Sequence, residues 1–195
     1  MTLHLNPREV AELSGVARRV VEKAIEEKVF AIQTGRNGVG PPRRMLGAKS
    51  VVYTAIMARL SGEITLTLAA KRKLARTLRG LALAVARTSH VEIVPDVTAD
   101  IGKLAGTAID RTERYVRSRD QWITSDPGIM AGLPIIRGTR IPVHSVEGRV
   151  RAGDSLDDII AENHDVPREA FEAALLFAKT HPLAGRPGVF VKVPA

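Results

Sequence analysis

Residues 129–143 read Ile-Met-Ala-Gly-Leu-Pro-Ile-Ile-Arg-Gly-Thr-Arg-Ile-Pro-Val, a run in which prolines and glycines separate short apolar pairs. Such a run disfavours a helix and predicts brief strands joined by tight turns. We expect these strands at residues 122–124, 135–136 and 141–143. Because Pro134 and Pro142 lack the amide that a central strand needs, they should lie at sheet edges, where a second chain can pair. A homodimer is one expected outcome.

Three helix-sized segments follow this run. They span about residues 144–152, closed by Gly153, then 155–163 and 167–180. Ser155 and Asp158 have the spacing of a capping box. An inward apolar stripe is expected on the last helix at Phe171, Ala174, Leu175 and Ala178. A second DNA-binding unit in these helices is disfavoured by the acidic residues Asp154, Asp157, Asp158, Glu162, Asp165, Glu169 and Glu172.

This part of the chain resembles the family called domain of unknown function 433, which is grouped with the VapB-type antitoxins. The resemblance covers residues 121–180. The matching residues are Asp126, Pro127, Ile129, Gly132, Pro134, Ile136, Arg137, Gly138, Thr139, Arg140, Ile141, Pro142, Val143, Gly153, Ser155, Leu156, Ile159 and Ile160. The resemblance implies a non-catalytic domain that binds a toxin, a PIN-like ribonuclease whose acidic metal site cleaves RNA.

We expect the dimer or toxin contacts in two places. The first is the strand region, at Ile136, Arg137, Arg140 and Ile141. The second is the tail of residues 181–195, at Arg186, Phe190 and Lys192. Val189–Val191 could add a strand to a partner, and Arg186 or Lys192 could pair with toxin carboxylates. A frayed terminus is the alternative for this tail.

The N-terminal residues predict two short helices around a tight turn. Asn6 can cap the first helix, Pro7 suits its first position, and Glu9 can reach back to the cap amide. Gly15 ends it, and a second helix should run from about residue 16 or 17 to about residue 28. Its expected buried residues are Val20, Val21, Ala24 and Ile25. The pattern predicts a helix-turn-helix, with Ala11, Gly15 and Val21 at its characteristic positions. The opening also resembles a MerR-type winged helix.

The second helix should carry the DNA-reading side chains. Its outward face holds Arg18, Arg19, Glu22 and Lys23, and its N-terminal end is expected to enter the major groove of double-stranded operator DNA. After an expected strand at residues 30–33, the glycine- and proline-rich residues 35–44 predict a wing along the phosphates. Its cations are Arg36, Arg43 and Arg44. The alternatives are a helical hairpin with a solvated face and a plain flexible loop.

Charge is distributed unevenly along the chain. Residues 1–90 contain 16 Lys/Arg and 6 Asp/Glu, a net charge of +10, whereas residues 91–195 contain 13 and 15, a net of −2. This asymmetry favours a polyanion partner for the first half. The sequence contains no cysteine, no signal-like N-terminus and no long apolar run. We therefore expect a cytoplasmic protein that is not associated with a membrane.

The middle of the chain predicts further helices at residues 49–60, 67–79 and 101–119, and strands at 81–85 and 91–94 with a turn at Pro95-Asp96. The helix at 67–79 is basic through Lys71, Arg72, Lys73, Arg76 and Arg79. That basic side could extend a DNA footprint or be a solvated face. The expected fold class is α+β, mainly α with small β elements. Its parts are a winged helix-turn-helix at 1–62, a connecting helical region at 63–120, the antitoxin-like domain at 121–180 and the tail.

Nothing in the sequence has the pattern of an active site. The histidines are His4, His90, His144, His164 and His181, and none has the spacing of a helical metal site. We expect no catalytic residue, no metal and no cofactor. The expected function is that of an antitoxin that neutralises a PIN-like toxin and represses its own operon. The alternative is a stand-alone transcriptional regulator whose C-terminal domain only dimerises. RNA binding is disfavoured by the 4% aromatic content, which offers few stacking platforms.

Overall fold

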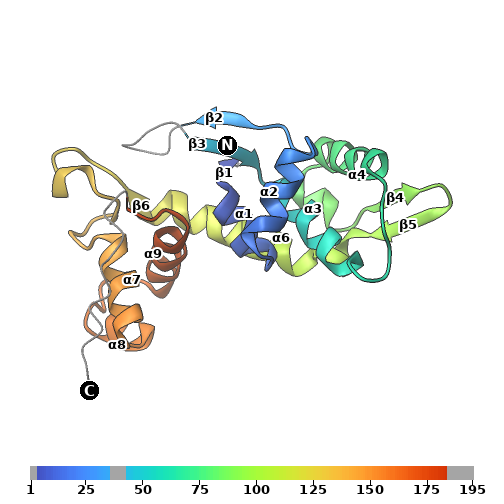
Figure 1. The fold of residues 1–195 in the computed structure, drawn as a ribbon. Helices are drawn as coiled ribbons and strands as arrows, with labels where there is room; N and C mark the ends of the chain where they lie inside the picture. Colours follow the sequence, from blue (N-terminus) through green and yellow to red (C-terminus); the bar gives the residue numbers. More distant parts are fainter. Residues whose placement is uncertain (1–3, 36–42, 184–195) are drawn as a thin grey trace, which may run out of the picture.

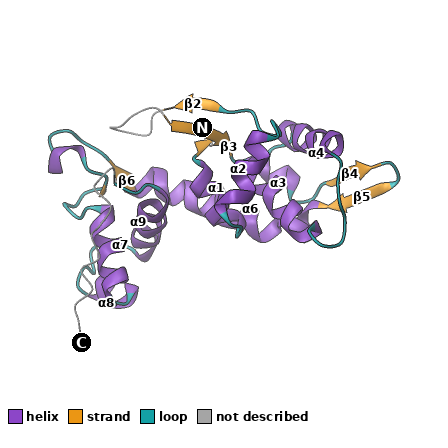
Figure 2. Cartoon of the chain, viewed as in Figure 1, coloured by secondary structure: helices purple, strands orange, loops and turns teal. Residues whose placement is uncertain are grey.

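The computed structural model describes residues 4–35 and 43–183 (Figure 1). Its helices are α1 (Pro7–Ser14), α2 (Arg18–Glu26), α3 (Lys49–Leu60), α4 (Leu68–Gly80), α5 (Leu83–Ala86), α6 (Ile101–Trp122), α7 (Val143–Ala152), α8 (Leu156–Ala161) and α9 (Arg168–Thr180). Its strands are β1 (His4–Leu5), β2 (Gln33–Gly35), β3 (Arg43–Gly47), β4 (His90–Val94), β5 (Val97–Asp100), β6 (Ile123–Thr124) and β7 (Ile135–Ile136). Figure 2 shows small sheets at the periphery of a mainly helical body, which confirms the α+β fold class.

Helix α1 begins and ends as the sequence predicts. The side chain of Asn6 accepts hydrogen bonds from the amides of Arg8 and Glu9 at 2.8 and 2.9 Å, and Glu9 Oε2 accepts one from the Asn6 amide at 2.7 Å. Gly15 closes the helix at φ 70°, a left-handed conformation that glycine adopts without steric cost. Local sequence signals therefore fix both ends of this helix.

Helix α2 follows at once and packs one face against α1. Val21, Ala24 and Ile25 are buried, as expected, and so is Ala11 on the facing helix. The expected burial of Val20 is wrong, because its side chain is 39% exposed. The helix is short, and only one narrow stripe of it faces the core.

A three-stranded antiparallel sheet, ordered β1-β3-β2, accompanies these helices. His4 pairs with Gly47, and Gln33 pairs with Met45. The strand expected at residues 30–33 starts only at Gln33. The preceding Phe30 packs its ring edge-on against Tyr53 of α3, with ring centroids 5.2 Å apart, so this apolar stretch serves helix packing rather than strand pairing.

One apolar core unites the elements from β1 to α6. Its fully buried side chains include Leu5, Leu46, Ile56, Leu74 and Ile109. The described parts of residues 4–62 therefore share this core with residues 63–120. A second, smaller cluster lies among β7, α7, α8 and α9, around Ile136, Val143 and Phe171. The long helix α6 runs from the β4–β5 hairpin towards the second cluster (Figure 1).

The middle of the chain departs from expectation at two places. The strand predicted at residues 81–85 is wrong: this segment contains helix α5, in which Ala86 is fully buried and alanine favours helix. Strand β4 is confirmed, but its partner β5 was not foreseen. The two strands pair in antiparallel fashion around a turn in which Asp96 takes φ 64°. Helix α6 runs three residues further than predicted, to Trp122.

The C-terminal helices lie close to their predicted ranges. Gly153 ends α7 at φ 115°. Ser155 caps α8 by accepting from the Asp158 amide, but the Asp158 carboxylate accepts from the Ser155 hydroxyl instead of the cap amide, so the capping box is half formed. The strand expected at residues 141–143 is reduced to one bridge between Ile135 and Pro142, because the next residue already begins α7. On α9, three of the four expected inward residues are buried, and the fourth, Leu175, is half-buried.

A buried ion pair ties α1 to α6. The carboxylate of Glu9 is fully buried, and its Oε1 accepts hydrogen bonds from Tyr115 Oη at 2.7 Å and from Arg119 Nη1 at 3.1 Å. The same Arg119 nitrogen donates to the carbonyl of His4 at 3.2 Å. Burial, followed by the charge of Glu9, raises the pKa of the Tyr115 hydroxyl, which therefore remains a donor. Each carboxylate oxygen of Glu9 thus has a partner.

The cap of α1 also contacts the end of α9. Asn6 Nδ2 donates to the Thr180 carbonyl at 3.3 Å and lies 3.0 Å from His181 Nε2. His181 Nδ1 lies 3.0 Å from the Phe177 carbonyl, which can only accept. The tautomer that satisfies both contacts carries its proton on Nδ1 and accepts from Asn6 through Nε2. The two halves of the chain therefore share a specific polar contact.

Candidate nucleic-acid interface

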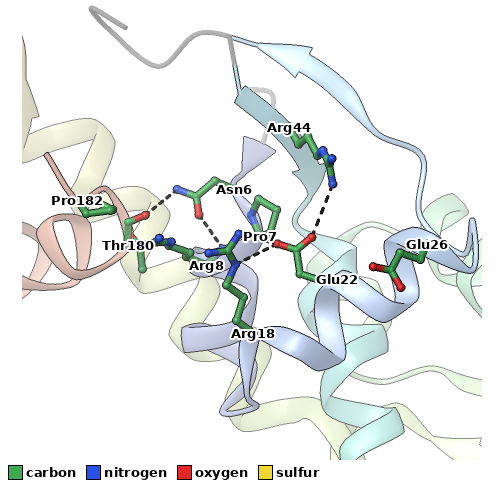
Figure 3. A pocket seen from close by; sticks show the side chains of 9 residues that line it. All are labelled: Asn6, Pro7, Arg8, Arg18, Glu22, Glu26, Arg44, Thr180 and Pro182. Atoms are coloured by element: carbon green, nitrogen blue, oxygen red, sulfur yellow. Dashed lines mark hydrogen bonds and ion pairs between the residues drawn. The ribbon is translucent and has the colours of Figure 1, made fainter. Parts of the chain in front are cut away.

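Helix α2, strand β3 and the end of α9 surround an open cleft of about 660 Å³ (Figure 3). The residues lining it are Asn6, Pro7, Arg8, Arg18, Glu22, Glu26, Arg44, Thr180 and Pro182. Three of these are arginines and two are glutamates, so the cleft has a net charge of +1. It is also where the chain leaves α9, so this basic surface adjoins the C-terminal half.

Glu22 holds two of these arginines together. Its Oε1 accepts hydrogen bonds from Arg18 Nε at 3.0 Å and Arg18 Nη2 at 2.8 Å, and its Oε2 lies 3.7 Å from Arg44 Nη1. The arginine side chains are 54% and 64% exposed. Glu22 thus links α2 to the hairpin and keeps both guanidinium groups at the surface.

The start of α2 combines free amides with positive charge. Its N-cap, Ala17, provides no side-chain hydrogen bond, so the first amides of the helix are left for solvent or an anion. Arg18, Arg19 and Lys23 are all exposed. The four α2 residues expected to read DNA therefore occupy the outward face, with Glu22 in their midst. Anions are stabilised at such a helix end.

The predicted wing is described only in part. Strands β2 and β3 pair in antiparallel fashion, and Arg44 of β3 reaches the cleft. Arg43 pairs its backbone with Gly35. Arg36 and the side chain of Arg43 lie outside the described residues. Arg8 also lines the cleft, although the sequence did not predict it as a DNA-binding residue. Its position two residues after the helix cap Asn6 is the signal that could have placed it there.

The basic helix α4 largely serves the fold. Lys71 Nζ lies 3.1 Å from Glu27 Oε2, and the Arg72 guanidinium donates to the Glu27 carbonyl at 2.7 and 3.2 Å. Cations at the C-terminal end of a helix satisfy its last carbonyls and its dipole, so these side chains stabilise the end of α2. Lys73 pairs with Glu92 at 3.4 Å. Arg76 and Arg79 remain exposed.

The residues expected to contact a partner protein divide into several groups. Ile136 is fully buried in the C-terminal core, so the expectation that it faces a partner is wrong. Arg137 Nε donates to the Gln121 carbonyl at 2.8 Å and so caps the end of α6, although the residue is exposed. Arg140 is exposed and Ile141 is half-buried against the core. The expected tail contacts Arg186, Phe190 and Lys192 lie outside the described residues.

The acidic surface of the last helices is partly neutralised. Arg149 reaches from α7 to Asp154 and, at 2.9 Å, to Glu162 Oε1. The hydrogen bond from Arg149 holds the pKa of Glu162 below its ordinary value. Arg168 pairs with Asp157. No group of three or more His, Asp or Glu side chains that could hold a metal ion occurs among the described residues.

Comparison with known proteins gives a family match over one segment and a relative over nearly the whole chain. Residues 123–178 match the family described as Protein of unknown function (DUF433). The uncharacterized protein y4eO of Sinorhizobium fredii is 30% identical over 202 residues, covering 97% of this chain and 87% of that protein. No solved structure matches the chain. Within the described residues, no helix has the length and apolar character needed to cross a membrane. The chain therefore belongs to the same family as y4eO, and its residues 123–178 match DUF433.

Proposed function

We propose that this protein is a cytoplasmic DNA-binding antitoxin. Its N-terminal half binds double-stranded operator DNA, with α2 in the major groove and the β2–β3 hairpin as a MerR-like wing. Its DUF433 domain dimerises and binds a PIN-like ribonuclease toxin. The observation that carries the DNA-binding part is the exposed basic end of α2 beside Arg44 of the hairpin. The toxin-binding part is supported by the resemblance of residues 121–180 to VapB-type antitoxins.

A turn in the DUF433 domain supports protein binding. Ile129, Met130 and Leu133 are 36%, 45% and 37% exposed, although each is a large apolar residue. In this turn Met130 and Ala131 take φ values of 49° and 54°, a left-handed conformation that costs residues with a Cβ roughly 1–2 kcal/mol each. Strained backbone is concentrated at functional sites. The turn thus presents apolar side chains where a partner could cover them.

The proposed antitoxin activity is tested by co-expression. The tagged chain is produced together with the product of its adjacent gene, and the purified material is assayed on RNA. A stable complex with suppressed ribonuclease activity is the expected result. If nothing co-purifies while the chain still binds its upstream DNA, the stand-alone regulator replaces the antitoxin. Stronger binding to single-stranded RNA than to duplex DNA would contradict both functions.

Removing Glu22 should increase non-specific DNA binding. The substitution Glu22→Ala deletes a negative charge and frees Arg18 and Arg44 to contact phosphates. Because each new phosphate contact contributes about 0.9 to the slope of log K against log salt, the slope should steepen by about 1–2. Fluorescence anisotropy with a random duplex at several salt concentrations measures this.

Glu26→Ala is the matched control for this prediction. Glu26 lines the same cleft on the same helix but pairs with no arginine among the described residues. It should change the slope by less than Glu22→Ala does. If both substitutions had an equal effect, the change in net charge alone would explain the change in slope. If Glu22→Ala weakened non-specific binding, Glu22 would not be holding Arg18 and Arg44 away from the phosphates.

A further inference from the structure

A second, smaller cleft of about 180 Å³ lies where strand β3 passes into helix α3. Only Ala48 separates β3 from α3, and it provides no side-chain cap. The first amides of this 12-residue helix therefore have no side-chain acceptor. The lining residues Gly47, Lys49 and Ser50 place the cleft at this helix end. The free amides and the dipole of a helix N-terminus favour an anion.

Two largely buried residues at the wall of the cleft, Ser50 and Tyr53, carry hydroxyl groups that make no hydrogen bond within the described residues. Tyr53 is 4% exposed and Ser50 is 8% exposed, and among the described residues neither hydroxyl makes a hydrogen bond. Within that part of the chain, the only fully buried side-chain polar atom without a partner is His144 Nδ1, so both hydroxyls reach open space. Each hydroxyl can therefore donate a hydrogen bond to an oxyanion that enters the cleft.

The charges around the cleft are positive. Lys49 and Arg79 line it without an ion pair among the described residues. No acidic residue lines the cleft within the described parts of the chain. Burial, followed by the carboxylate of Glu27, raises the pKa of the Tyr53 hydroxyl, so this group stays protonated and can donate. Glu27 itself is paired with Lys71 on α4, at 3.1 Å.

We propose that this cleft binds a small oxyanion, the phosphate or carboxylate group of a metabolite. The ligand would accept hydrogen bonds from the first α3 amides and from the Ser50 and Tyr53 hydroxyls, with Lys49 and Arg79 balancing its charge. Val29 and Ala31 of the α2–β2 connection also line the cleft. A bound anion would therefore fix the position of the β2–β3 hairpin relative to α2. The affinity for DNA would then depend on the ligand, and this consequence alone rests on the proposed function.

The test uses the full chain without DNA, so its result is independent of DNA binding. Inorganic phosphate is titrated into ¹⁵N-labelled protein against sodium chloride at equal ionic strength. We expect saturable shifts of the Lys49 and Ser50 amide resonances with a dissociation constant on the order of 1 mM, which is within the affinity limit for so small a ligand. Acetate in place of phosphate shows which oxyanion is preferred, and saturable binding of either supports the site.

Variants separate a built site from general charge attraction. Tyr53→Phe, Lys49→Gln and Arg79→Gln should each weaken binding about tenfold, since each removes a hydrogen bond to a charged group. Arg76→Gln removes the same charge from the same helix outside the cleft and should leave the affinity unchanged. Lys49 and Arg79 are not buried, so their variants should fold normally. They therefore still test the site if Tyr53→Phe fails to fold. Shifts that do not saturate, or an equal loss in Arg76→Gln, would overturn the proposal.

Discussion

Replacing Glu9 by alanine should lower the free energy of unfolding by about 3–5 kcal/mol, the usual effect of removing one partner of a buried ion pair. The substitution leaves the Arg119 guanidinium, whose side chain is 12% exposed, without its buried counter-ion. It also removes the acceptor for the Tyr115 hydroxyl and opens the capping box at Asn6. Urea unfolding followed by circular dichroism measures the change.

Two comparisons make this prediction specific. Glu12→Ala removes an exposed carboxylate from the same helix and should change the stability by less than about 0.5 kcal/mol. A double-mutant cycle with Arg119→Ala should give a coupling energy above about 1 kcal/mol, because the two groups are in direct contact. A loss below about 1 kcal/mol for Glu9→Ala would show that the buried pair does not hold α1 to α6.

Replacing Arg18 and Arg19 together by alanine should weaken binding to the upstream DNA of the gene by at least about thirtyfold. Each arginine contact to a base edge or phosphate contributes roughly 1–3 kcal/mol, and two such contacts are lost. Both side chains are exposed, so the melting temperature should stay within a degree or two of the wild type. Fluorescence anisotropy at fixed salt measures the affinity.

The control for this variant removes two exposed arginines from α6, Arg114 and Arg117. It matches the change in net charge but leaves α2 and the hairpin intact, so the specific affinity should fall much less. Equal losses in the two double variants would mean that overall charge, and not the face of α2, determines binding. That outcome would remove the main support for the proposed interface.

The sequence predicts those parts of the fold that local signals control. Asn6, Pro7 and Glu9 specify the start of α1, Gly15 specifies its end, and Gly153 specifies the end of α7. The outward face of α2 follows from its helical period, apart from Val20. Such features depend on residues within one or two turns of each other, so the sequence contains the information needed.

Other features depend on residues that are far apart in the chain. Glu9 was expected only as part of a cap, yet its partners Tyr115 and Arg119 lie 106 and 110 residues away. Ile136 matched the family pattern, but its full burial depends on packing against α9 and its neighbours. The wall of the small cleft likewise combines β1, β3, α3 and α4. Tertiary packing decides all three, and periodicity carries no information about it.

Competition binding on the upstream DNA of the gene tests whether the α2–hairpin surface binds a specific duplex. The labelled upstream fragment is bound by the wild-type protein and challenged with an unlabelled unrelated duplex and with itself. We predict that the unrelated duplex competes at least about a thousandfold less well, as for specific DNA-binding proteins. Equal competition by both duplexes, with the protein folded, would contradict specific DNA binding by this surface.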